Sequence, residues 1–165
     1  MRAGRAARIA KTGMVLSLSA FALLVAFNNL TDYGSNFLFV RHVLSMDTTF
    51  PGNALLWRAM GAPWTWHAAY LAIILGELLT GILFAIAGLA MLRCLGDGPP
   101  QVFAAARGLV NYGTLAGFLV WFLGFSVIGG EWFAMWQSHQ WNGQAPAFRF
   151  FITMLAVCIY AQQPE

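Results

Sequence analysis

Glu77 is the residue whose position most directly indicates chemistry, because it lies inside the apolar run from Ala68 to Leu92. An ionisable group in a membrane-spanning helix is costly and is therefore a candidate functional residue. Helical spacing places His67 and Tyr70 on the same side of the helix as Glu77. The functional interpretation is that Glu77 acts as a proton relay or anchors the headgroup of a quinone. We favour the alternative, a buried carboxyl that fastens its helix to a neighbour, because no further acidic residues lead inward from it.

The carboxyl of Glu77 needs hydrogen-bond partners on neighbouring helices at the same depth. Trp121 offers an indole N–H, and Ser17 or Ser19 offers a hydroxyl. The sequence therefore predicts an intramembrane polar site that consists of Glu77, His67, Tyr70, Trp121, Ser17 and Ser19.

Histidine and acidic side chains also occur between the apolar runs, at His42, His67, His139, Asp47 and Glu131. Imidazole and carboxylate groups bind divalent metals, and two facing histidines hold a haem. The metal-binding spacings HxxxH and HExxH do not occur in the sequence, and neither does a nucleophile elbow. We therefore predict no metal, no cofactor and no catalytic residue, and we leave quinone and lipid open as ligand classes.

All tryptophans except Trp121 lie between the apolar runs that we place on the outer side of a membrane. Indole rings favour the headgroup region, but such a belt alone does not enrich one side so strongly. We predict that the two outer connections pack on each other and form a surface for a partner, which we call the outer cap. It consists of Trp57, Arg58, Trp64, Trp66, Glu131, Trp132, Trp136, His139, Trp141 and Asn142.

The outer connections contain signals for short interfacial helices. Ser35 is a candidate N-cap for the first of these helices, and Asn53 for the second. In the stretch GGEWFAMWQSHQWNGQ, helical spacing places Trp132, Met135 and Trp136 on one face of a third short helix.

The elements that must position these residues follow from the composition. The chain has 165 residues, of which 59% are hydrophobic and only 9% are charged, as is typical of membrane proteins. Each long apolar run is sufficient to cross a hydrocarbon core of about 30 Å. We predict one all-α membrane domain, 1–165, with spans near 12–31, 68–92, 108–130 and 146–162, outer loops 32–67 and 131–145, and an inner loop 93–107.

Basic residues predict the orientation of these spans. Arg2, Arg5, Arg8 and Lys11 precede the first span, and the 93–107 connection holds two further arginines. The positive-inside rule therefore predicts cytoplasmic N- and C-termini. The alternative for the N-terminus is a cleaved signal peptide, because a basic segment precedes an apolar run.

Several longer stretches carry a family resemblance. HVLSMDTTFP, HAAYLAIILGE, WFLGFSVIGGEWFAMWQS and WNGQAPAFRF together resemble a bacterial family of predicted small integral membrane proteins of unknown function. The resemblance runs over about residues 25–155. It implies four spans and a location in the bacterial inner membrane, and it brings no activity, catalytic residue or cofactor.

These observations favour a non-catalytic accessory or scaffold subunit of a larger membrane complex, for example a respiratory or other energy-transducing complex. Its partners would be the lipid bilayer and that complex. Nucleic acid is excluded, because the basic residues lie beside apolar runs. The alternative is a binder or carrier of a small molecule, quinone-like or proton-coupled, that is centred on Glu77.

Overall fold

The computed structural model describes residues 2–96 and 99–164, and this part of the chain is helical without any strand. The elements, in chain order, are α1 (Arg2–Thr31), α2 (Tyr33–Ser45), the 3-10 helix η1 (Leu56–Arg58), α3 (Pro63–Arg93), α4 (Pro100–Gly108), α5 (Val110–Phe118), the π-helix η2 (Leu119–Trp132), the 3-10 helix η3 (Met135–Gln137) and α6 (Gln144–Gln162).

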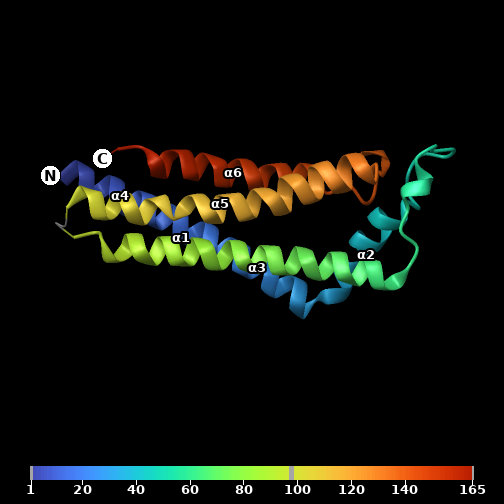
Figure 1. Ribbon diagram of the computed structural model, residues 1–165, viewed down its shortest axis with the longest axis horizontal. Coiled ribbons are helices and arrows are strands. Elements are labelled where there is room, and N and C mark those ends of the chain that lie inside the picture. Colours follow the sequence, from blue (N-terminus) through green and yellow to red (C-terminus); the bar gives the residue numbers. More distant parts are fainter. Residues whose placement is uncertain (1, 97–98, 165) are drawn as a thin grey trace.

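Four helical rods are long and apolar enough to cross a membrane: Gly4–Thr31, Pro63–Arg93, Gln101–Trp132 and Gln144–Gln162. The third rod runs through α4, α5 and η2, and the last has 19 residues, or about 28 Å of helix. Figure 1 shows the rods side by side along the long axis of the molecule. The predicted fold class, an all-α bundle of four membrane helices, is thereby confirmed.

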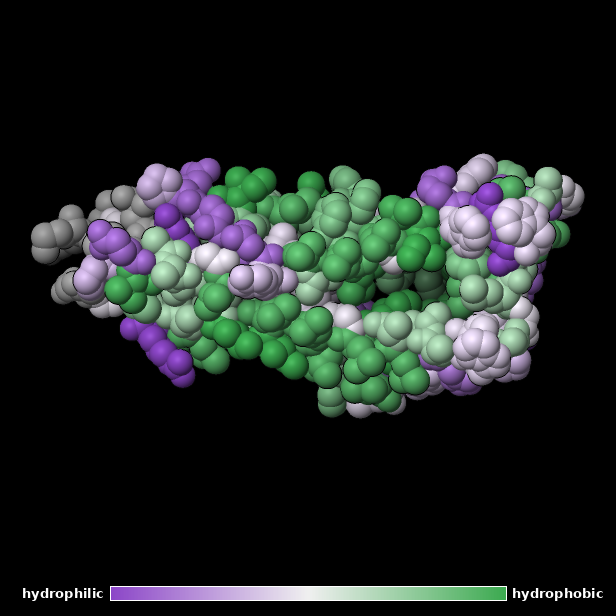
Figure 2. Space-filling view, in the orientation of Figure 1, coloured by the Kyte–Doolittle hydropathy of each residue, from purple (hydrophilic) through white to green (hydrophobic). Residues whose placement is uncertain are grey.

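The surface of the bundle changes along its length. Figure 2 shows an apolar middle between two ends at which polar residues gather. At one end, which we call the basic end, lie the N- and C-termini and the start of α4 (Figure 1). The other end holds the connections 32–62 and 133–143, and we call it the tryptophan-rich end.

Glycines allow the central helices to approach closely. A Cβ atom at Gly81 of α3 would lie 2.6 Å from Cγ of Leu23 on α1. Where α3 meets α5, the ring of Phe84 covers Gly113, where an added Cβ would lie 2.7 Å from Cδ1 of that ring. The hydrophobic effect does not drive helices together in lipid, so van der Waals packing takes a larger part. Small residues at these positions let the helix backbones approach and thereby allow that packing.

The basic end is closed by hydrogen bonds to the end of α6. The side chain of Lys11, which is buried, donates to the carbonyl of Gln163. Nη1 of Arg107 donates to the same carbonyl over 2.6 Å. The amide of Gln162 in turn donates to the carbonyl of Arg107 over 3.1 Å. Basic side chains therefore satisfy carbonyls that follow the last helical turn.

The short helices at the tryptophan-rich end begin differently from the prediction. Asp32 stands at the N-cap of α2, and Ser35 lies inside that helix, where its hydroxyl donates to Oδ2 of Asp32 over 2.7 Å. The prediction of Ser35 as the N-cap is therefore wrong. The Oδ1 atom of Asn53 accepts from the backbone N–H of Leu55 over 2.9 Å, just before η1.

The predicted common face of Trp132, Met135 and Trp136 is also wrong. The helix η2 ends at Trp132, and Ala134, which has a φ of 52° in the left-handed region, separates it from η3. Met135 is consequently turned inward and only 2% exposed, whereas Trp132 and Trp136 are exposed. A local reversal of the backbone, which helical spacing does not reveal, separates the three side chains.

Candidate functional site

A buried polar junction joins α1 to α3. Nδ2 of Asn29 donates to Oε2 of Glu77 over 2.7 Å, and both side chains are buried. The hydroxyl of Tyr70 donates to the carbonyl oxygen of Asn29 over 3.2 Å. Nδ2 of Asn36, on α2, donates to Oδ1 of Asn29 over 2.6 Å. Asn29 thus connects Glu77 to an exposed amide near the start of α2.

Aromatic rings cover this junction toward the tryptophan-rich end. The hydroxyl of Tyr33 lies 2.9 Å from Nδ1 of His67, and the Tyr33 ring packs edge-on against Tyr70 with centroids 4.6 Å apart. Phe37 stacks on His67 at 4.3 Å between centroids. His67 and Tyr70, which were predicted with Glu77, therefore do lie along the same side of α3, with Tyr33 and Phe37 against them.

The predicted partners of Glu77 on the other helices are wrong. The hydroxyl of Ser19 donates to the carbonyl of Gly81, and that of Ser17 to the carbonyl of Gly13, each over 2.8 Å. In the antiparallel packing of α1 on α3, Ser19 therefore lies level with Gly81, about one helical turn deeper than Glu77.

Trp121 is likewise engaged elsewhere. Its ring packs between Phe21 and Phe150, with centroid separations of 6.0 and 5.7 Å. It is almost fully buried and belongs to the aromatic core where α1, η2 and α6 meet.

The sequence does not indicate Asn29 as the partner of Glu77. Asn29 lies near the end of an apolar run, where a polar residue is expected simply as the boundary of a span.

The two connections at the tryptophan-rich end pack on each other, as the distribution of the tryptophans predicts. Oε1 of Gln137 accepts from the backbone N–H of Phe50 over 3.0 Å and from Nδ2 of Asn53 over 3.1 Å. The hydroxyl of Thr48 donates to Oγ of Ser138 over 2.9 Å. These cross-connection hydrogen bonds tie the first connection to the second.

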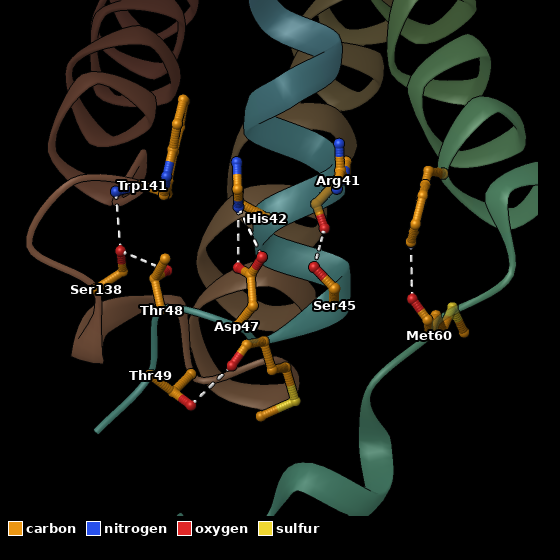
Figure 3. Close-up of polar contacts among 11 residues, drawn as sticks. Arg41, His42, Ser45, Asp47, Thr48, Thr49, Met60, Ser138 and Trp141 are labelled. Carbon is orange, nitrogen blue, oxygen red and sulfur yellow. Dashed lines mark hydrogen bonds and ion pairs between the residues drawn. The ribbon is translucent and has the colours of Figure 1, made fainter. Parts of the chain in front are cut away.

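A second set of contacts reinforces this packing (Figure 3). His42 stacks on Trp141 with ring centroids 4.6 Å apart, and Nδ1 of His42 lies 2.9 Å from Oδ2 of Asp47. Oγ of Ser138 accepts from the backbone N–H of Trp141 over 2.9 Å. His42 and Asp47 act here as a structural pair. Nowhere in the described chain do three His, Cys, Asp or Glu side chains gather as a metal site requires.

Arg58 forms the most distinctive contact of the outer cap. Its guanidinium lies over the rings of Trp57 and Trp132, 5.2 and 4.6 Å from their centroids. Nη1 donates to the carbonyl of Trp132 over 3.2 Å, and Nε is buried without an acceptor in the part of the chain that the structure covers. Trp57 is nevertheless 71% exposed and Trp132 47% exposed.

Other residues of the predicted cap divide into two groups. Nε1 of Trp66 donates to the carbonyl of Met60 over 2.7 Å, and Oδ1 of Asn142 accepts from the backbone N–H of Gln144 over 3.1 Å, so these two fix the local chain. The exposed group contains Trp64, Glu131, Trp136 and His139.

A cavity of about 630 Å³ opens between α2, α3 and the α5–η2 rod, and we call it the slot. Apolar side chains and small residues line it, among them Val40, Ala72, Gly76, Gly124 and Phe133. Figure 2 shows the hollow between the two halves of the bundle, near the tryptophan-rich end. Glu77 does not line the slot, because its side chain points to α1 on another face of α3.

Comparison with known proteins agrees with this architecture. No curated protein and no solved structure matches the sequence. A family model described as "predicted small integral membrane protein (DUF2165)" matches residues 7–164, which is nearly the whole chain. A match of this extent includes all four apolar rods and both connections of the tryptophan-rich end. The chain therefore belongs to this family of predicted small integral membrane proteins.

Proposed function

We propose that the protein is a non-catalytic accessory or scaffold subunit of a larger membrane complex, and that it docks through the outer cap. The observation that carries this proposal is the combination of order and exposure at the tryptophan-rich end. Gln137 and Ser138 tie the two connections together, yet the rings of Trp57, Trp132 and Trp136 remain largely exposed.

Exposed aromatic rings on an ordered frame are what a docking surface requires. Tryptophan and arginine are the side chains most enriched among residues that dominate binding energy in protein interfaces. Trp57 and Trp132 are already held against Arg58, so their binding loses little side-chain entropy. If the cap served only to cover the bundle, its largest rings would be turned inward as Met135 is.

The proposal includes an orientation in the bacterial inner membrane. Arg5, Arg8, Lys11, Arg93 and Arg107 all lie toward the basic end. Under the positive-inside rule this end is cytoplasmic, and the outer cap faces the periplasm. The docking partner would therefore present a surface at the periplasmic face of the membrane.

Within this proposal Glu77 has a structural role. Its carboxyl accepts a hydrogen bond from Asn29, and the two side chains bridge α1 and α3 at a point that water does not reach. A polar contact of this kind fastens helices in lipid, where neither partner finds a substitute in the surrounding acyl chains.

Copurification from a mild detergent tests the docking role. We expect the wild-type protein to retain a stoichiometric protein partner, and the double variant Trp132→Ala with Trp136→Ala to lose it. Phe148→Ala is the matched control, because Phe148 is an exposed aromatic residue on α6, outside the outer cap. Retention of the partner by a well-folded double variant would show that these tryptophans only contact lipid.

A second candidate function is the binding of a small lipophilic molecule, and the slot is the observation that favours it. The cavity of about 630 Å³ is large enough for a ligand and is lined almost entirely by apolar groups. The slot, and not Glu77, would then be the centre of binding. Lipid and pigment analysis of the purified protein tests this second candidate independently of any protein partner.

A further inference from the structure

We propose that the slot holds one acyl chain of an anionic phospholipid, and that Arg58 binds the phosphate of the same lipid. This inference rests on the second candidate function, because it names the class of molecule that the slot takes. It adds a headgroup site at the tryptophan-rich end, so that one lipid would connect the membrane interior to the outer cap.

The dimensions of the slot fit an acyl chain better than an enclosed helix. Along α3 the slot extends from Ala69 to Leu83, which is about 21 Å of helix. A helix about 10 Å in diameter fills roughly 400 Å³ per turn, so 630 Å³ encloses only about one and a half turns. A spanning helix of a partner would therefore lie mostly outside the slot, whereas an extended alkyl chain follows its length and lies inside it.

The space exists because both walls carry small residues. Ala69 and Ala72 face the slot from α3, and Ala116 and Gly124 face it from the α5–η2 rod. At Gly124, an added Cβ would meet only the carbonyl of Leu119 at 3.7 Å. A void with apolar walls loses dispersion contacts unless it is filled, and within a bilayer the available filler is lipid.

The wall contributed by η2 has an unusual backbone. Residues Leu119–Trp132 form a π-helix, and the backbone N–H of Phe133 donates to the carbonyl of Ile128 over 3.0 Å, five residues earlier. π-helical turns are rare and frequently mark functional sites. Here the wide turns bring Gly124 and Ile128 to the surface of the slot and end at the residues that contact Arg58.

Arg58 is connected to the wall of the slot through Trp132. It donates to the carbonyl of Trp132, and the next residue, Phe133, lines the slot. No carboxylate forms an ion pair with Arg58 in the described ranges, and its Nε lacks an acceptor. The guanidinium thus carries a charge that no carboxylate balances, and a phosphate at its terminal nitrogens supplies an opposite charge and acceptor oxygens.

The rings around Arg58 agree with this placement. Trp57 and Trp132 flank the guanidinium and are exposed, and tryptophan favours the depth of the lipid headgroups. A phosphate bound to the guanidinium would lie beside these rings at headgroup depth, and the acyl chain below it would enter the slot. The order of groups along the site therefore matches the order of groups in a phospholipid.

Native mass spectrometry with defined lipids tests this assignment. We expect the wild-type protein to retain one phosphatidylglycerol per chain and to prefer it about tenfold over diacylglycerol, which has the same acyl chains but no phosphate, because one charge-assisted contact is at stake. Arg58→Gln should abolish the preference, whereas Arg41→Gln, a charge-matched change on α2, should leave it intact. Ala72→Phe should remove the retained lipid, and Ala68→Phe, on an exposed face of α3 outside the slot, should not.

Several results would overturn the assignment. Undiminished lipid retention by both Ala72→Phe and a second slot variant, Ala116→Phe, would exclude the slot, and using two variants guards against a folding defect in either. A preference for phosphatidylglycerol that survives Arg58→Gln would exclude Arg58. Competition by free glycerol phosphate would indicate a soluble anion and not a lipid. If neutral lipids were retained equally by the wild-type protein, only the headgroup site would fail, whereas loss of all lipophilic ligands would remove the second candidate function itself.

Discussion

The amide of Asn29 on α1 and the carboxyl of Glu77 on α3 are joined by a hydrogen bond of 2.7 Å inside the bundle. Tyr70 adds a second polar contact from α3 to the same segment of α1, through the Asn29 carbonyl. Because α1 and α3 also approach closely at Gly81, the polar junction lies within the most extensive helix contact of the described chain. It fixes the register of the two helices that support the rest of the fold.

Substitutions at Glu77 should distinguish the contribution of its hydrogen bond to stability from the contribution of its packing. Glu77→Gln keeps an acceptor for Asn29, so we expect the folded state to be retained. Glu77→Leu leaves the Asn29 amide buried without its acceptor and should destabilise the protein by about 1–3 kcal/mol. Thermal unfolding in detergent measures the difference. The combined variant Glu77→Leu with Asn29→Leu should be less destabilised than the sum of the two single changes, and simple additivity would contradict the pairing.

Glycine-to-alanine changes should have opposite effects at two positions. Gly113 lies under the fully buried ring of Phe84, which has no room to move, so Gly113→Ala should destabilise by about 1–3 kcal/mol. At Gly13 of α1 an added Cβ meets nothing within 4 Å. Gly13→Ala should therefore stabilise by roughly 0.5–1 kcal/mol through helix propensity alone. Equal melting temperatures of the two variants would contradict the close α3–α5 contact.

Much of the architecture follows from sequence because membrane helices are set by length and apolarity. The apolar runs that contain Glu77 and Trp121 both become rods of the bundle. The partner of Glu77 is harder to predict, because it depends on the register of α1 against α3. Leu23 lying against Gly81 contributes to this register, which brings Asn29 to Glu77 and places Ser19 at the carbonyl of Gly81.

The tryptophan-rich end shows the same limit. The enrichment of tryptophan predicts that the connections pack together, and Gln137 and Ser138 make that contact. The direction of each ring is not predictable from helical spacing, because Ala134 takes a left-handed conformation without a glycine to signal it. The slot is also not predictable from the sequence, since it depends on which small residues of α3 and of the α5–η2 rod come to face each other and not on any motif.

His42 should contribute to the stability of the tryptophan-rich end mainly through the stacking of its ring. His42 and Asp47 are both partly exposed, so we expect Asp47→Ala to cost less than about 1 kcal/mol. Trp141 stacks on His42 and also packs edge-on against Phe39, so Trp141→Ala should cost about 3 kcal/mol or more. Chemical denaturation of the two variants compares them directly. A larger effect of Asp47→Ala would mean that the ion pair, and not the stacking, holds this segment.

The proposed orientation predicts opposite accessibility at the two ends. In a variant with Cys94 and Cys158 replaced by serine, single cysteines are introduced as Gly96→Cys and Gly52→Cys, both at exposed positions that accept a Cβ atom sterically. Gly52 has a φ of 75°, so its variant requires a check of folding. A membrane-impermeant maleimide applied to intact cells should label Gly52→Cys only. Labelling of Gly96→Cys alone would reverse the orientation.

Photocrosslinking in intact membranes tests the docking role of the outer cap most directly. A benzophenone amino acid at Leu56, which is exposed beside Trp57, should form a crosslink to one specific protein. The same group at Ile159, which is exposed on α6 toward the basic end, serves as the control and should react mainly with lipid. A single protein adduct at Leu56 that disappears with Trp132→Ala and Trp136→Ala is the result we predict. Lipid adducts alone at both positions would contradict the proposal that this protein docks on a partner through its outer cap.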